Sequence, residues 1–196
     1  IVPIKSSLIG DFNIQNLAIA IAIADKLSVP HASIQRGIET IKRIPGRMEQ
    51  VYCKENKRIF IDYAHTPDAL KQVLSSLRKL CSGKLICVFG CGGERDTLKR
   101  PLMAAVAEEY ADLIIITNDN PRSEDPREIV TDILRGIKNM TVTKIILDRK
   151  EAIRYSIGIL KENDCLLIAG KGHETFQDLG KIKIPFDDRD VIRQLI

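Results

Sequence analysis

The sequence lacks a disulfide framework. Its 196 residues contain five cysteines, an odd number, with no Cys-x-x-Cys pair and no zinc-finger spacing. Disulfides are rare in reducing compartments, so this pattern favours a cytoplasmic protein. Cys87 and Cys91 flank the end of a predicted strand, but no second pair of metal ligands follows them, and we interpret both as small core or loop residues. The cysteines therefore predict neither a metal site nor an extracellular scaffold.

Long hydrophobic runs are also missing. The longest, Leu17 to Ala24, ends at Asp25, whereas a helix needs about 20 apolar residues to cross a bilayer. No signal peptide pattern is present. The net charge of +4 is too small to indicate nucleic-acid binding, although it suits a small polyanionic substrate. We therefore expect a cytoplasmic monomer with no membrane or nucleic-acid partner.

The composition, 44% hydrophobic and 29% charged, is that of a globular protein. The length fits one ordinary domain plus a piece of a second. The first residue is Ile1 and not methionine, which we interpret as a sign that the chain is part of a longer protein.

The first 45 residues predict two helices. Residues 12–28 are apolar nearly all round, which indicates a helix buried on most sides. Residues 31–42 form an amphipathic pattern with isoleucines on one face. Ile44-Pro45-Gly46 then breaks the periodicity. We expect a domain boundary here, with residues 1–45 as the helical end of one domain and residues 46–196 as a second domain.

The second part predicts an α/β fold, a doubly wound and mostly parallel sheet. A hairpin over 49–53 and 58–62 comes first, and further apolar β-rich runs follow at 85–90, 113–117, 143–147 and 165–169. Helical patterns lie between them at 67–81, 98–110, 126–138 and 149–162. Continuous apolar strands that alternate with helices are typical of a parallel sheet covered on both faces. Thr66-Pro67 and Asp125-Pro126 each place a capping residue before a proline at a helix start.

Polar or glycine-rich loops follow the strands, at 62–68, 90–96, 119–125 and 170–174. Because parallel strands bring their carboxyl ends to one edge, we expect these loops to meet there and form a single site. The loop at 90–96 is similar to a dinucleotide-binding fingerprint, but Arg95 stands where the last glycine should be, which disfavours a cofactor site of that kind. The sequence contains no GxxxxGK[ST] phosphate-binding loop.

Asp119-Asn120-Pro121-Arg122 is the most informative of these segments. Arginine can bind a carboxylate with two parallel hydrogen bonds, while aspartate and asparagine can accept hydrogen bonds from an ammonium group. This mixture suits a ligand that carries both groups. The alternative is a surface turn, which Asn-Pro also favours.

Several single residues have two interpretations. His65, close to Asp62 at a strand exit, favours ligand contact over a structural role. His173 could shape its loop or contact a ligand, and Lys171 could be solvated. The acidic segment 187–190 predicts a solvated helix start.

Taken in order, the motifs resemble those of the Mur ligases, in particular the branch that adds diaminopimelate. The resemblance runs from Gly10 essentially to the end and rests on the segments 10–16, 46–49, 62–68, 90–96, 99–101, 119–122 and 170–174.

The resemblance implies an ATP-dependent, Mg²⁺-requiring ligase of peptidoglycan precursor synthesis that joins meso-diaminopimelate to UDP-MurNAc-L-Ala-D-Glu through an acyl phosphate. Residues 1–45 would be the end of the central ATPase domain and 46–196 the amino-acid-binding domain. The phosphate loop, the metal ligands and the main ATPase residues would lie outside this chain, which alone would be inactive. The implied ATP contacts are Asn16, Arg47, Asp62 and His65. The implied diaminopimelate contacts are Arg95, Asp119, Asn120, Arg122, Gly170 and Glu174.

Three alternatives remain open. The lysine-adding homologue is one, although such relatives lack an arginine at the position of Arg122. A noncatalytic amino-acid-binding module is the second, which a phosphate-binding loop in the upstream gene sequence would reject. A nicotinamide-dependent dehydrogenase is the third, and Arg95 in the glycine-rich loop argues against it.

Overall fold

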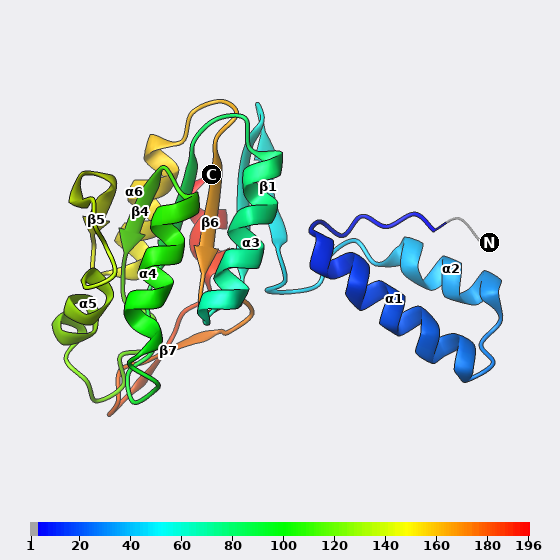
Figure 1. Ribbon diagram of the computed structural model, residues 1–196, viewed down its shortest axis with the longest axis horizontal. Coiled ribbons are helices and arrows are strands. Elements are labelled where there is room, and N and C mark those ends of the chain that lie inside the picture. Colours follow the sequence, from blue (N-terminus) through cyan, green and yellow to red (C-terminus); the bar gives the residue numbers. More distant parts are fainter. Residues whose placement is uncertain (1–3) are drawn as a thin grey trace.

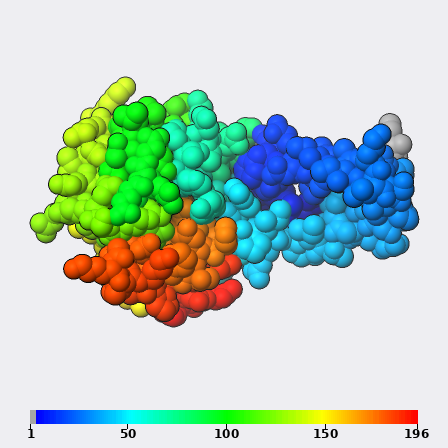
Figure 2. Space-filling model, turned by 90° about the horizontal axis from the view of Figure 1, so that it is seen from below, coloured from blue at the N-terminus to red at the C-terminus, as the bar shows by residue number. Residues whose placement is uncertain are grey.

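The computed structural model describes residues 4–196, which form a helical pair and a larger body built on a sheet. Figure 1 shows the pair, α1 and α2, set apart from the sheet and the helices that surround it. The space-filling view in Figure 2 shows the same two lobes, which meet at the cyan segment of the chain.

The helical pair consists of α1 (Asp11–Lys26) and α2 (His31–Thr40). The prediction that the first helix is buried on most sides is wrong for the described part of the chain. Ile14, Ile19 and Ile23 are 65%, 60% and 57% exposed. One helix can cover only one stripe of its neighbour, so the remaining apolar surface of α1 faces solvent.

The body contains a sheet of six strands in the order β1-β2-β6-β3-β4-β5. The strands are β1 (Glu49–Lys54), β2 (Lys57–Asp62), β3 (Leu85–Phe89), β4 (Leu113–Ile116), β5 (Thr143–Ile145) and β6 (Cys165–Ala169). Every neighbouring pair is parallel except the hairpin of β1 and β2. The predicted fold class, a mostly parallel sheet with helices, is confirmed.

Both faces of the sheet are covered, as the continuous apolar strands predict. Helices α3 (Pro67–Leu80), α4 (Lys99–Tyr110) and α5 (Pro126–Leu134) cover one face, and α6 (Arg149–Ile159) and α7 (Asp188–Leu195) cover the other. Successive side chains of β3 alternate between the two cores, with Cys87 and Phe89 in the first and Ile86 and Val88 in the second. The sheet is therefore a rigid support for the loops at its edge.

Two predicted helix starts are confirmed. The Thr66 hydroxyl accepts the Ala69 amide at 3.3 Å, ahead of Pro67 at the start of α3. The Asp125 carboxylate accepts the Arg127 amide at 2.8 Å at the start of α5. Each cap fixes where a strand-to-helix loop ends and a helix begins.

A small hairpin, β7 (Phe176–Asp178) and β8 (Lys183–Pro185), was not predicted. A 3-10 turn at Met140–Val142 also precedes β5. The hairpin packs on the loop after β4, since the Asp178 carbonyl accepts the Arg122 amide at 3.1 Å and the Gln177 side chain donates to the Asp119 carbonyl at 2.8 Å. The sequence did not predict this hairpin because strands of three residues are too short to show the alternation of apolar and polar side chains that marks a strand.

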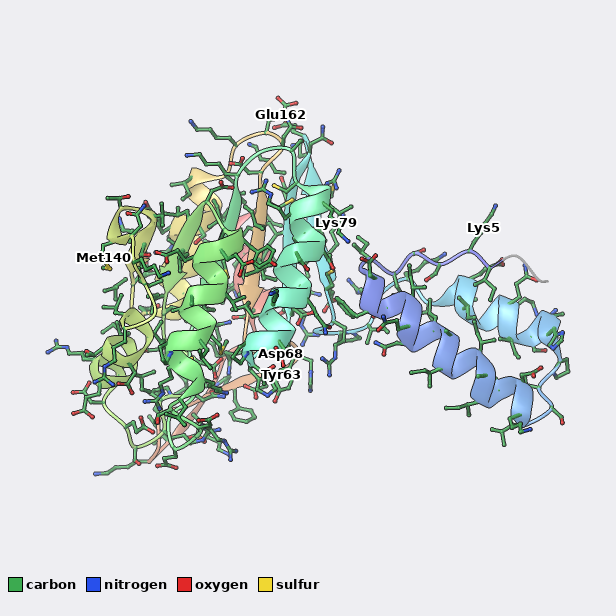
Figure 3. All side chains as sticks on the ribbon, viewed as in Figure 1. Lys5, Tyr63, Asp68, Lys79, Met140 and Glu162 are labelled. Atoms are coloured by element: carbon green, nitrogen blue, oxygen red, sulfur yellow. The ribbon has the colours of Figure 1, made fainter. Side chains whose placement is uncertain are left out.

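The linker between the helical pair and the sheet is fixed to the sheet. The Gly46 carbonyl accepts the Tyr63 amide at 2.8 Å, and the Asp62 carboxylate accepts the Met48 amide at 2.6 Å. A Cβ at Gly46 would lie 2.6 Å from the backbone nitrogen of His173, so only glycine fits. Lys79 on α3, labelled in Figure 3, also reaches Asp11 on α1 at 2.8 Å.

The cysteines fall into two groups. Cys53 on β1 is exposed, whereas Cys81, Cys87, Cys91 and Cys165 are buried. Burial raises the pKa of both Cys87 and Cys91 to about 12, which keeps their thiols protonated.

Candidate functional site

A cavity of about 430 Å³ lies at the carboxyl edge of the parallel strands. Loops after β2, β3, β4 and β6 supply its walls, so the prediction that these loops meet at one edge of the sheet is confirmed. All six residues predicted to contact the amino acid line it, together with Tyr63, His65, Thr66, Gly90, Cys91, Gly92, Asp96 and Lys99. Figure 3 labels Tyr63 at this edge and Glu162 at the opposite one.

Asp119 brings a carboxylate into the cavity from the loop after β4. Burial raises its pKa, although the charges of Arg149 and Lys171 oppose this effect. A carboxylate buried in this way gains from a cationic ligand, because the ligand replaces the lost hydration.

Gly170 gives the Asp119 carboxylate its room. A Cβ at Gly170 would lie 2.5 Å from Asp119 Oδ2. The residue also has a φ of +108°, a backbone conformation that residues other than glycine rarely adopt. The glycine is therefore required by both the backbone and the site.

We predict that Gly170→Ala in the full-length protein displaces the Asp119 carboxylate and weakens amino-acid binding at least tenfold. Isothermal titration or the KM for the amino acid would measure this loss. Gly158→Ala is a matched control, because nothing lies within 4 Å of a Cβ there. Unchanged affinity in Gly170→Ala would contradict the role of this contact.

Lys171, Asn120 and Glu174 form one buried network. The Lys171 ammonium is fully buried and donates to Asn120 Oδ1 at 3.0 Å and to Glu174 Oε2 at 2.8 Å. Burial of Glu174 opposes its ionisation, but the hydrogen bonds from Lys171 and Asn120 and the charges of Lys171 and Arg122 lower its pKa overall. Glu174 therefore remains a carboxylate at neutral pH. Lys171, which the sequence left open as a solvated residue, is not exposed to solvent.

Arg122 directs its guanidinium along the same wall. Its Nη1 donates to the Gly93 carbonyl at 2.6 Å, and its Nε lies 3.9 Å from Asp178 Oδ2. The residue has a φ of 53°, an uncommon conformation for a non-glycine residue that often marks functional sites. Arg95 lies exposed at the cavity on the loop after β3. The cavity thus combines two guanidinium groups with the carboxylates of Asp119 and Glu174.

Sequence reasoning missed Arg100, which connects two of the loops. Its guanidinium is buried and pairs with Glu124 at 2.7 Å and with Asp132 at 2.9 Å. Glu124 in turn accepts the amide of Glu94. The glycine-rich loop is therefore held against the loop after β4. The sequence shows Arg100 within the run 99–101, but it does not reveal the partners of its guanidinium, which lie 24 and 32 residues further along the chain.

Sequence reasoning also missed a buried ion pair between Arg149 and Asp188. Neither side chain is exposed, and two parallel hydrogen bonds of 2.8 Å join them. Arg149 also donates to the Ala169 carbonyl at 3.0 Å and the Asn118 carbonyl at 3.4 Å. The pair thus fixes the ends of β4 and β6 beside the cavity. The interpretation of the segment 187–190 as a solvated helix start is wrong for Asp188.

The four residues predicted to contact ATP are dispersed. His65 lines the cavity, and the centre of its ring lies 4.6 Å from the centre of the Tyr63 ring. The exposed Arg47 guanidinium lies over the Tyr63 ring, 5.9 Å from its centre. Asp62 is buried, and its two oxygens accept the amides of Met48 and Ala64. Asn16 is exposed on α1, outside the cavity.

Burial raises the pKa of Asp62, although those two amides and Arg47 oppose this effect. The geometry places its carboxylate in a structural role, fixing the linker. The four ATP contacts stay predictions.

Within residues 4–196, no three His, Cys, Asp or Glu side chains gather closely enough to hold a metal ion. No helix in the same range has the length and hydropathy needed to span a bilayer.

Comparison with known proteins identifies the family of the chain. The family model "Mur ligase, glutamate ligase domain" matches residues 46–172. The UDP-N-acetylmuramoyl-L-alanyl-D-glutamate--2,6-diaminopimelate ligase of Coxiella burnetii is 49% identical over 92% of this chain and 37% of its own. The ligase of the same name from Aquifex aeolicus is 47% identical over 98% of this chain and 39% of its own.

A solved structure of a ligase with this name aligns with a TM-score of 0.76 and 39% identity, covering 98% of this chain and 40% of that one. The chain thus spans less than half the length of the curated relatives it matches. Because the family model covers most of the sheet and its loops, the chain belongs to the Mur ligase family.

Proposed function

We propose that these residues form part of the ATP-dependent ligase that joins meso-diaminopimelate to UDP-MurNAc-L-Ala-D-Glu in the cytoplasm during peptidoglycan precursor synthesis. The observation that carries the proposal is the pairing of charges around one cavity. Asp119 and Glu174 offer carboxylates, and Arg95 and Arg122 offer guanidinium groups. Diaminopimelate carries two ammonium and two carboxylate groups and can use both kinds of partner.

In this proposal residues 46–196 bind the amino acid, and residues 1–45 belong to the central ATPase domain. The exposed apolar side of α1, which includes Ile14, Ile19 and Ile23, supports this assignment because a larger domain would cover it. The γ-phosphoryl group of ATP passes to the terminal carboxylate of UDP-MurNAc-L-Ala-D-Glu, which gives an acyl phosphate and releases ADP. Mg²⁺, held by residues outside this chain, would neutralise charge on the phosphates. Asn16, Arg47, Asp62 and His65 are proposed to serve the adenine and ribose, with Asp62 acting through the linker that it holds.

The role of this chain in the reaction is to position the amine. The free amine of diaminopimelate attacks the acyl carbon, forming a tetrahedral intermediate. Collapse of the intermediate breaks the bond from carbon to the phosphate oxygen, and inorganic phosphate leaves with the electron pair while the nitrogen loses a proton. Holding the distal end of the amino acid by charge leaves the reacting amine free. Such orientation can lower the activation free energy of the attack by about 7 kcal/mol or more in favourable cases.

The test is ligation by the full-length protein with ATP, UDP-MurNAc-L-Ala-D-Glu and either meso-diaminopimelate or L-lysine, with products identified by mass spectrometry. We expect the diaminopimelate product and little lysine product. Equal use of lysine would favour the lysine-adding alternative. Amino-acid binding without ligation would favour the noncatalytic module.

We predict that the 196-residue chain alone does not hydrolyse ATP, because it contains no GxxxxGK[ST] phosphate-binding loop. Phosphate release from chain purified free of contaminating ATPases would measure this. The full-length protein, assayed with all substrates, is the positive control. Sustained turnover by the short chain would contradict the assignment of the ATPase residues to another part of the protein.

A further inference from the structure

Lys171 is a buried charge that does not line the cavity. Its ammonium donates to three acceptors, Asn120 Oδ1 at 3.0 Å, Glu174 Oε2 at 2.8 Å and the Phe176 carbonyl at 2.6 Å. An ammonium has three protons, so its donor capacity is fully used. Lys171 therefore has no proton left for a ligand, and it influences the cavity through the groups that it holds and through its charge, which also acts on Asp119.

The first of these groups is the side-chain amide of Asn120. Its Oδ1 accepts from both the Lys171 ammonium and the Asp178 amide, the latter at 2.9 Å. Both neighbours can only donate, which fixes the amide oxygen toward them and the nitrogen toward Glu174 Oε2 at 2.9 Å. The amide nitrogen has a second proton beyond the one given to Glu174, and Asn120 lines the cavity, so the side chain can offer a donor there. This differs from the expectation that its oxygen accepts from an ammonium.

The second group is the Glu174 carboxylate. Lys171 and Asn120 both donate to Oε2. Glu174 also lines the cavity, so its Oε1 is the oxygen left to accept from a ligand. Because the hydrogen bonds and the positive charge of Lys171 favour ionisation, Glu174 keeps its charge despite its partial burial.

We propose that Lys171 is a positioning residue that sets the polarity of the cavity. It turns the Asn120 amide so that its nitrogen joins Arg122 in a carboxylate-binding half, and it keeps Glu174 ionised in an ammonium-binding half with Asp119. The ligand class is an amino acid whose bound end carries both charges on one carbon. The inference deepens the proposed function and rests on it.

The first test compares Lys171→Met with wild type in the full-length ligase. Methionine keeps most of the length of the side chain and removes its charge and donors. We expect the KM for meso-diaminopimelate to rise roughly ten- to a hundredfold, as for the loss of a charge-assisted hydrogen bond. The kcat/KM preference for diaminopimelate over lysine falls as well, because the released amide can turn its oxygen to the lysine ammonium. The KM for ATP stays unchanged.

Lys161→Met is the matched control, since Lys161 is exposed before β6 at the opposite edge of the sheet. A role in stability alone would lower kcat by one factor for both amino acids and leave both KM values and the preference unchanged. That result would overturn the inference.

Asn120→Asp tests the same inference without removing Lys171, and it decides the question if Lys171→Met fails to fold. The aspartate keeps the oxygen that faces Lys171 and replaces the donor with a second oxygen. If Asn120 is a donor, the KM for diaminopimelate rises at least tenfold. If Asn120 accepts from the ammonium, the KM falls or stays the same, which would overturn the inference.

Ligation by the wild-type enzyme tests the proposed function separately from the role of Lys171. A wild-type enzyme that leaves meso-diaminopimelate unligated overturns the proposed function and the inference together. A wild-type enzyme that ligates it, while Lys171→Met retains both its KM and its preference, overturns the inference alone.

Discussion

Arg122→Ala in the full-length ligase is expected to raise the KM for meso-diaminopimelate by roughly ten- to a hundredfold while leaving the KM for ATP nearly unchanged. A charge-assisted bidentate pair contributes about 1.5–3 kcal/mol, which gives this range. Alanine adopts the observed φ of 53° with the same difficulty as arginine, so the change removes the guanidinium without altering the backbone strain. Steady-state kinetics with each substrate varied in turn measures the effect.

Lysine provides the contrast for this variant. Its distal end has an ammonium but no carboxylate, so we expect Arg122 to repel it in the wild-type enzyme. Arg122→Ala should therefore reduce the preference for diaminopimelate. Arg127→Ala, an exposed arginine on α5, is the control and should change neither KM. Wild-type enzyme that ligates lysine as efficiently as diaminopimelate would show that Arg122 has been assigned the wrong role.

Arg149→Met is expected to lower the free energy of unfolding by about 3–5 kcal/mol, because it leaves the Asp188 carboxylate buried without its partner. The double variant Arg149→Met/Asp188→Leu should recover much of this loss, since both charges are then absent. Urea denaturation of the 196-residue chain, followed by circular dichroism, measures all three stabilities.

Arg154→Met is the matched control for this experiment. It lies on the same helix, α6, and its pair with Glu151 is about half exposed on both sides. Surface pairs of this kind contribute up to about 1 kcal/mol, so the control should lose no more than that. A loss of similar size in Arg149→Met would mean that the buried pair does not hold the ends of β4 and β6.

The sheet could be predicted from sequence because its strands are continuous apolar runs, and apolar burial is a local pattern. Ile114, Ile115 and Ile116 show this directly, since all three are fully buried. The convergence of the loops then followed from the geometry of parallel strands. The burial of α1 could not be predicted in the same way. Its apolar residues indicate that something covers the helix, but not whether the covering residues lie within the chain.

The supports of the cavity could not be predicted because they are long-range and polar. Arg149 and Asp188 are 39 residues apart, and the two residues that follow each of them along the chain are charged, as on a protein surface. Lys171 is similar, since its burial depends on the hairpin of β7 and β8, whose strands are too short to recognise. The orientation of the Asn120 amide depends on Lys171 in turn. Residue types indicated the ligand, whereas the arrangement of donors and acceptors required the fold.

The distribution of cysteines offers a single point of chemical attachment. Maleimides react with thiolates at exposed positions, and the four buried thiols are shielded from them. Cys53 pairs with Arg58 at the start of β2, the end of the strand remote from the cavity. A fluorophore or a surface tether coupled to the native chain would therefore attach at one site and leave the cavity open to ligands.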